Sequence, residues 1–99
     1  MLRYVEDHFA EEVTVAKIAD SVALSESACL RSFRQFLGIT PIQYLKQFRV
    51  EKAAELLRST RLKTGEIGLE CGFSDGSYFI RTFREIKHCT PREYRTLFC

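Results

Sequence analysis

The sequence lacks the features of a membrane, secreted or linker-rich protein. It has no low-complexity run and no stretch rich in glycine and serine or in proline, with five glycines and two prolines in 99 residues. No apolar run approaches the roughly 20 residues that a membrane-spanning helix needs. The N-terminal segment MLRYVEDHFAEE has no signal-peptide core. These absences predict one small soluble domain that acts in the cytoplasm, away from membranes.

Metal-binding and catalytic motifs are missing as well. The four cysteines, Cys29, Cys71, Cys89 and Cys99, form no CxxC pair, and there are only two histidines, so no zinc site is expected. Cys29 and Cys71 fall on apolar stripes, which favours buried, reduced thiols over redox sensing. The chain has no paired carboxylates, no Cys–His or Ser–His arrangement and no glycine-rich phosphate loop. We therefore expect neither an enzyme nor a cofactor.

Charge is unevenly distributed along the chain, although the net charge is only +2. Residues 1–30 carry two basic and six acidic side chains (−4), whereas residues 31–49 carry four basic side chains and no acidic one (+4). Residues 50–79 carry four basic and five acidic side chains (−1), and residues 80–99 carry five basic and two acidic ones (+3). Two basic segments in an otherwise neutral or acidic chain modestly favour nucleic-acid binding.

The two basic segments also share a sequence pattern. Residues 30–44, LRSFRQFLGITPIQY, align without gaps with residues 80–94, IRTFREIKHCTPREY. The identical pairs are Arg31/Arg81, Phe33/Phe83, Arg34/Arg84, Thr40/Thr90, Pro41/Pro91 and Tyr44/Tyr94. The repeat extends towards the N-terminus, at an offset of 49 residues before a turn near Ala23 and of 50 residues after it.

The apolar spacing is helical throughout, which predicts an all-α fold. We expect seven helices, near residues 2–9, 15–22, 26–37, 41–58, 64–71, 75–87 and from residue 91 onward. A first subdomain (about 1–39) and a second (about 62–99) would then be joined by the long helix 41–58.

Capping residues support these boundaries. Thr14 and Ser25 are expected N-caps, as is either Ser74 or Asp75, and Gly38 suits the end of a helix. The segments TPIQ (40–43) and TPRE (90–93) each combine Thr at the N-cap, Pro at the first position and Gln or Glu at the third, which is a capping box. For the core, the spacing predicts Val15, Ile18, Ala19 and Val22 on one face, and Cys29, Phe33 and Phe36 on another.

A short helix, a tight turn and a longer basic helix form the helix-turn-helix arrangement, in which the second helix reads the major groove. The predicted reading faces carry Ser27, Leu30, Arg31 and Arg34 in the first unit, and Ser77, Ile80, Arg81 and Arg84 in the second. Arginine suits this role because its planar fork can bond guanine O6 and N7 together. The competing interpretation is a solvated helix face or an intrahelical ion pair, such as Arg81 with Glu85.

The connecting helix, about 18 residues long, would span roughly 27 Å. Successive major-groove faces on one side of B-DNA lie about 34 Å apart. One chain could therefore place two reading helices in adjacent turns, with the DNA bent towards the protein because the connector is slightly short.

The segments IADSVALSESACLRSFRQFLGITPIQYLKQFRVEKAAELL and EIGLECGFSDGSYFIRTFREIKHCTPREYR resemble the DNA-binding domain of AraC/XylS-type bacterial transcription regulators. The resemblance covers almost the whole chain. It implies seven helices in two helix-turn-helix subdomains, each a homeodomain-like three-helix unit, joined by a linker helix and bound to an asymmetric site in double-stranded promoter DNA. Members usually carry a separate effector-binding or dimerisation domain, so the chain is interpreted as the DNA-binding part of a larger regulator.

The resemblance also implies contact residues. Base contacts are expected from Ser27, Ala28, Leu30, Arg31, Gly76, Ser77, Ile80 and Arg81. Apart from the resemblance, phosphate contacts are expected from Ser25, Arg34, Lys46, Ser74, Arg84 and Lys87. Leu30 and Ile80 either touch thymine methyl groups or join the core, and the sequence does not decide between these alternatives. It also leaves the role of Arg49 open, whereas Tyr44 and Tyr94 are expected to pack beside their capping boxes.

Five residues depart from the family pattern, two of them Leu30 and Ile80, where the family often has a small polar residue. Ala23 replaces the usual Gly or Asn at the first turn, where a positive φ would cost about 1 kcal/mol. Gly68 stands where Ala is usual and would weaken its helix, and His88 replaces the usual Gly at the end of a helix.

Two other functions compete with DNA reading. The same helices could form a protein-interaction module, for example one that binds RNA polymerase. A related helix-turn-helix domain also occurs in DNA-repair methyl acceptors, but the acceptor motif Pro-Cys-His is absent from this chain.

Overall fold

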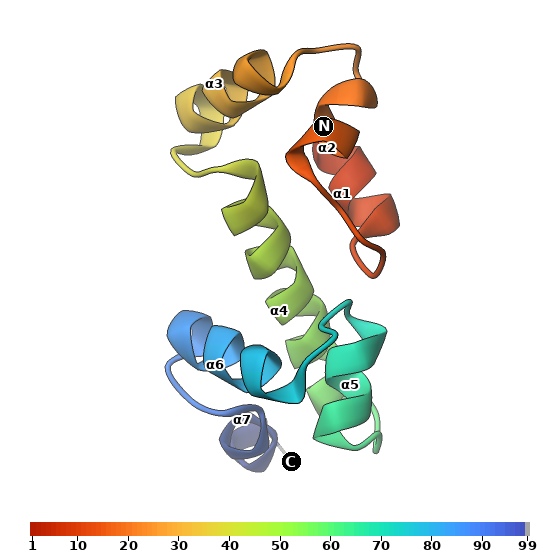
Figure 1. The fold of residues 1–99 in the computed structure, drawn as a ribbon. Coiled ribbons are helices and arrows are strands. Elements are labelled where there is room, and N and C mark those ends of the chain that lie inside the picture. The colour runs from red at the N-terminus through yellow and green to blue at the C-terminus, as the bar shows by residue number, and fades with distance from the viewer. Residues whose placement is uncertain (99) are drawn as a thin grey trace. The chain divides into compact units, whose positions relative to one another are not determined.

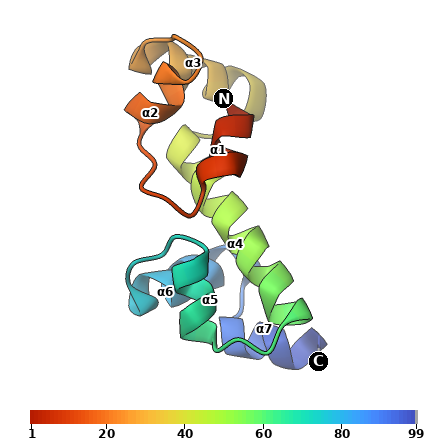
Figure 2. The same cartoon turned by 90° about the vertical axis from the view of Figure 1, so that its right-hand side faces the viewer.

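A computed structural model describes residues 1–98, which form two helical units, residues 1–48 and the residues from Arg49 onward. The helices are α1 (Leu2–His8), α2 (Val15–Asp20), α3 (Glu26–Leu37), α4 (Pro41–Ser59), α5 (Thr64–Glu70), α6 (Gly76–Lys87) and α7 (Pro91–Phe98). Across these 98 residues there is no strand (Figures 1 and 2). The all-α prediction of seven helices is therefore confirmed.

Each unit contains one helix-turn-helix pair, α2–α3 or α5–α6, together with part of α4. In the first unit α1 accompanies α2 and α3, and in the second α7 accompanies α5 and α6 (Figures 1 and 2). None of the helices within residues 1–98 combines the length and apolar character needed to cross a bilayer.

Side-chain caps start the helices where the sequence predicted them. Thr14 and Ser25 each accept a hydrogen bond, 3.2 Å long, from the backbone N–H three residues later. Of the two candidates before α6, it is Asp75 that caps the helix, because its Oδ1 accepts from the backbone N–H of Ser77 at 2.9 Å. Such caps satisfy N–H groups that have no partner inside the helix, and each stabilises its helix by about 1 kcal/mol.

Both capping boxes are also confirmed. At the start of α4, Thr40 Oγ1 accepts from the backbone N–H of Gln43 at 3.1 Å, and Gln43 Oε1 accepts from the N–H of Thr40 at 2.8 Å. At the start of α7, Thr90 and Glu93 make the same two bonds, at 3.1 and 2.8 Å.

The two units need a left-handed backbone at the same two places. At the tight turn, Ala23 has φ 56° and its repeat partner Gly72 has φ 94°. After the second helix of each pair, Gly38 has φ 73° and its partner His88 has φ 63°. Each unit thus meets one of these requirements with glycine and the other with a residue that pays a steric penalty of about 1 kcal/mol.

Each of the two units has its own hydrophobic core. The core of the first unit consists of Val5, Val13, Ile18, Ala19, Cys29, Phe33 and Leu45. The buried apolar residues of the second unit are Val50, Ala53, Ala54, Leu57, Ile67, Cys71, Phe73, Phe79, Phe83 and Tyr94. These side chains fix which face of α3 and of α6 remains open to solvent.

The two tyrosines of the repeat pack as predicted. The ring of Tyr44 contacts that of Phe33 edge-on, with centroids 5.9 Å apart. Tyr94 is buried, contacts Phe83 edge-on at 5.5 Å and accepts a hydrogen bond from Arg58 through its hydroxyl.

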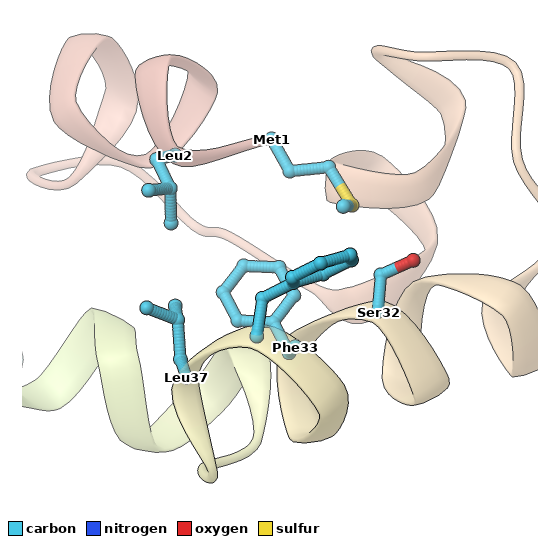
Figure 3. A pocket seen from close by; sticks show the side chains of 6 residues that line it. Met1, Leu2, Ser32, Phe33 and Leu37 are labelled. Carbon is cyan, nitrogen blue, oxygen red and sulfur yellow. The ribbon is translucent and has the colours of Figure 1, made fainter.

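Two predicted core residues are wrong. Val22 is 43% exposed because α2 ends at Asp20, so the helical spacing does not continue to it. Phe36 is 77% exposed because it lies in the last turn of α3, beside a hollow that no helix of the first unit fills. Figure 3 shows this hollow between the start of α1 and the end of α3, and the residues that line it are Met1, Leu2, Ser32, Phe33, Phe36 and Leu37.

Candidate nucleic-acid interface

The exposed face of α3 carries the residues predicted to read DNA in the first unit. Cys29 and Phe33 are buried at 0% and 2% exposure, which turns the opposite side of the helix outward. On that side Ser27, Leu30 and Arg31 are exposed, Arg34 follows one turn later, and Ala28 is half-buried. The structure therefore brings the five predicted side chains of α3 onto one helix.

The exposed face of α6 has the same composition. Phe79, Thr82 and Phe83 are buried, and the predicted reading residues Gly76, Ser77, Ile80, Arg81 and Arg84 are all exposed. A shallow hollow on this face is lined by Ser77, Ile80, Arg81, Arg84 and Glu85. The two helices predicted to read DNA, α3 and α6, thus present matching sets of small, aliphatic and basic side chains to solvent.

The exposed fractions decide an alternative that the sequence left open. Leu30 is 42% exposed and Ile80 is 46% exposed, so neither side chain belongs to a core. Each is adjacent in sequence to an exposed arginine. An aliphatic side chain in that place can pack against a thymine methyl group while the neighbouring arginine bonds a guanine.

Aromatic rings position two arginines of the second unit. The Arg81 guanidinium lies 5.8 Å from the ring centroid of Tyr78, a cation–π distance that restrains the side chain without occupying its N–H donors. Arg49 lies 5.9 Å from the ring centroid of Phe73. Burial lowers the pKa of Arg49 from its ordinary value, and the residue is half-buried, so Arg49 belongs to the packing of the second unit.

The residues predicted to contact phosphate fall into two groups. Ser25, Arg34, Ser74 and Arg84 are exposed on the reading helices or directly before them. Lys46 and Lys87 are half-buried, and Lys87 Nζ donates to Glu51 Oε1 at 2.5 Å. A phosphate would have to compete with the Glu51 carboxylate for this ammonium group.

Sequence reasoning missed two cations in the second unit. Lys63, directly before α5, and Arg92, in the first turn of α7, line a groove that also includes Ser74 and Gly76. A comparison of the two repeats could have identified them, because the first unit has the uncharged residues Thr14 and Ile42 at the positions of Lys63 and Arg92.

The prediction that Cys29 and Cys71 are buried thiols is confirmed. Cys29 and Cys71 are buried, and burial raises the pKa of both, that of Cys71 to about 11. Both thiols therefore stay protonated at neutral pH and are poor nucleophiles. Cys99 lies outside the described residues. Within residues 1–98, no three His, Cys, Asp or Glu side chains come together in a way that could hold a metal ion.

Comparison with known proteins identifies the family to which this fold belongs. The family model of a helix-turn-helix domain matches residues 18–96. The chain is 39% identical over 95 residues to the HTH-type transcriptional activator RhaS of Escherichia coli. That match covers 96% of the chain and 34% of RhaS. The chain belongs to the AraC/XylS family.

Solved structures agree with this assignment. An AraC-type transcriptional regulator from Chromobacterium violaceum has a TM-score of 0.94 and 35% identity, and the match covers 99% of this chain and 88% of that one. The DNA-binding domain of AdpA, solved in complex with a target DNA, has a TM-score of 0.92 and 27% identity over 98% of this chain and 87% of its own. The AraC/XylS chain described here spans about a third of the length of the curated relatives it matches.

Proposed function

We propose that this chain binds double-stranded promoter DNA sequence-specifically, as the DNA-binding part of a bacterial transcription regulator in the cytoplasm. The observation that carries the proposal is the duplicated reading face. Two helices of one chain, each second in a helix-turn-helix pair, expose an aliphatic residue followed by an arginine at matched positions. A solvated surface has no reason to repeat this arrangement.

In this proposal α3 and α6 each enter a major groove near their N-terminal halves. Arg31 and Arg81 bond guanines, Leu30 and Ile80 contact thymine methyl groups, and Ser27, Ala28, Gly76 and Ser77 complete the set that approaches base edges. Arg34 and Arg84, one turn further along, bind phosphates, as do Ser25 and Ser74 beside the helix starts. Contacts from Lys46 and Lys87 are part of the same proposal.

The two grooves are proposed to be adjacent ones. Most helix-turn-helix proteins reach two successive grooves by forming a dimer, whereas this chain carries two units that are joined by α4. A single chain would then bind an asymmetric site, and the site would bend towards the protein. An effector-binding or dimerisation domain and a contact with RNA polymerase are proposed for the complete regulator.

Selection of binding sites from random duplex DNA tests the proposal. We expect two short preferred blocks, about one helical turn apart, because each unit reads its own groove. A single block would mean that only one unit reads sequence.

A helical protein-interaction module is the second candidate, favoured by the exposed apolar side chains at the end of α3. The salt dependence of duplex binding separates the two functions. Neutralisation of about six phosphates gives a log–log slope near −5. Absent or salt-independent binding to all duplexes would favour the interaction module.

A further inference from the structure

A groove of about 930 Å³ crosses the second unit beside the start of its reading helix. Residues of three elements meet there: the start of α5, the segment that leads into α6, and α7. The residues that matter for its chemistry are Lys63, Glu66, Ser74, Gly76, Arg92 and Arg95.

The groove carries a net positive charge, because three cations (Lys63, Arg92 and Arg95) face one acid, Glu66. Arg95 is already engaged, since its guanidinium donates to the backbone carbonyls of Leu57 and Thr60 at 3.2 Å each.

The other two cations are available to a ligand. Lys63 and Arg92 are both exposed, and within residues 1–98 neither side chain makes a hydrogen bond or an ion pair. Two unengaged cations on the walls of one groove suit an extended anion better than a single small ion.

The groove is continuous with the reading face of α6. Ser74 and Gly76 line it, and the same two residues are a predicted phosphate contact and a predicted base contact. A DNA strand whose bases meet the start of α6 would therefore pass over the mouth of this groove. The repeating charge of such a strand, one phosphate per nucleotide, matches two separate cations.

The first unit has no counterpart of this groove chemistry. At the positions of Lys63 and Arg92 the repeat has Thr14 and Ile42, neither of which is charged. The nearby Lys17, which stands where the second unit has Glu66, donates its ammonium to the backbone carbonyl of Glu12 at 2.9 Å. The difference is specific to the second unit, so it does not follow from the helix-turn-helix fold alone.

We infer that this groove is an additional phosphate-binding surface, in which Lys63 and Arg92 bind backbone phosphates of the DNA strand beside the block read by α6. The inference rests on the proposed function. It adds two contacts that carry no sequence information, and it makes the second unit the more strongly anchored of the two.

The experiment compares Lys63→Gln, Arg92→Gln and the double variant with the parent chain. Binding is measured from 50 to 200 mM salt, on a duplex that carries the selected site and on a random duplex of equal length. We expect each single substitution to reduce the log–log salt slope by about 0.9, and the double variant to reduce it by about 1.8. Affinity should fall by a similar factor on both duplexes, and the selected sequence should not change.

Two controls separate the groove from net charge. Arg3→Gln also removes one positive charge, from an exposed residue of α1 that lies 4.0 Å from Asp7, and should leave the slope unchanged. Glu66→Gln removes the negative charge of the groove and should strengthen binding to both duplexes. Circular dichroism checks that each variant keeps its helical content. If the double variant does not fold, the two single variants at exposed positions still test the inference.

Unchanged slopes in Lys63→Gln and Arg92→Gln would overturn the inference, as would an equal loss in Arg3→Gln or a changed sequence preference. The parent chain alone tests the proposed function. If it selects a site while the variants keep its slope, the groove inference fails and the proposed function stands.

Discussion

Gly68 shows how a single residue can compensate for another elsewhere in the same unit. It lies inside α5, where glycine weakens a helix by up to about 1 kcal/mol relative to alanine. A Cβ at this position would lie 2.7 Å from Cδ2 and 2.9 Å from Cγ of the buried Phe79 ring. At the matched positions the first unit has Ala19 and Cys29, a larger residue on one helix and a smaller one on the other. In the second unit the smaller Gly68 leaves room for the larger Phe79 ring, so packing requires glycine at position 68.

Alanine at position 68 should therefore destabilise the protein despite its better helix propensity. Overpacking a core costs about 1–3 kcal/mol, which outweighs the propensity gain, so we expect Gly68→Ala to lose about 1 kcal/mol. For a domain of this size, thermal denaturation should show a decrease in Tm of about 4–8 °C.

Gly65→Ala in the same helix is the matched control, because a Cβ there meets no atom within 4 Å. Its Tm should rise or stay constant. A Tm increase in both variants would show that the Phe79 ring moves aside at little cost.

Exposed fractions of single residues were the least predictable quantity. Helical spacing placed Phe36 and Val22 in the core, but spacing identifies a face and not what covers it. Phe36 is exposed because its side chain borders the hollow between the start of α1 and the end of α3, and this depends on tertiary packing. The same limitation left Leu30 and Ile80 undecided until their exposure was known.

At the scale of helices, the boundaries were predictable because the signals that set them are local. A capping box joins residues only three positions apart, so Thr40 with Gln43 and Thr90 with Glu93 could be recognised without knowledge of the fold. The left-handed positions of Ala23 and His88 were instead implied by the family resemblance, because the family usually has Gly or Asn at the first and Gly at the second.

The two boxes differ in one respect that acid can reveal. Glu93 is ionisable, whereas its partner in the repeat, Gln43, is not. Hydrogen bonds from the backbone N–H and the side chain of Thr90 hold the pKa of Glu93 below its ordinary value of 4.5. Because the folded pKa is lowered, this box contributes its stability above pH 4.5, and the contribution is lost as the pH falls through the folded pKa.

Glu93→Gln tests this pH dependence. The difference in Tm between the parent chain and the variant should be constant from pH 7 to about 5 and should then shift in favour of the variant as the pH falls. Thermal denaturation from pH 7 to 3 measures it, and the other carboxylates cancel because both proteins share them. Parallel Tm curves over the whole range would show that the box does not depend on ionised Glu93.

At the scale of the whole chain, the fold and the exposed faces of α3 and α6 could be predicted from the repeat and the family resemblance. The groove beside α6 could not, because Lys63, Ser74 and Arg92 belong to three different elements and meet only through tertiary structure.

If each unit reads its own block, the two arginines should act separately. Arg31→Ala should relax the preference in one block and Arg81→Ala in the other, each by about 1–3 kcal/mol of discrimination, because each variant loses one bidentate contact. Repeating the site selection with both variants measures this. Loss of preference in both blocks from either substitution would show that the units read DNA cooperatively.

The hollow at the end of α3 also bears on how far the two copies have diverged. The repeat offsets pair Leu2 with Glu51 and Leu37 with Lys87. The second unit therefore joins α6 to α4 by an ion pair between Lys87 and Glu51, where the first unit has two aliphatic side chains beside an apolar hollow. A residue of one pair cannot replace its counterpart in the other pair alone, because a lysine at position 37 would face Leu2 and not a carboxylate. Single residues can thus no longer be exchanged between the two units at these positions. A functional chimera would have to exchange a complete unit.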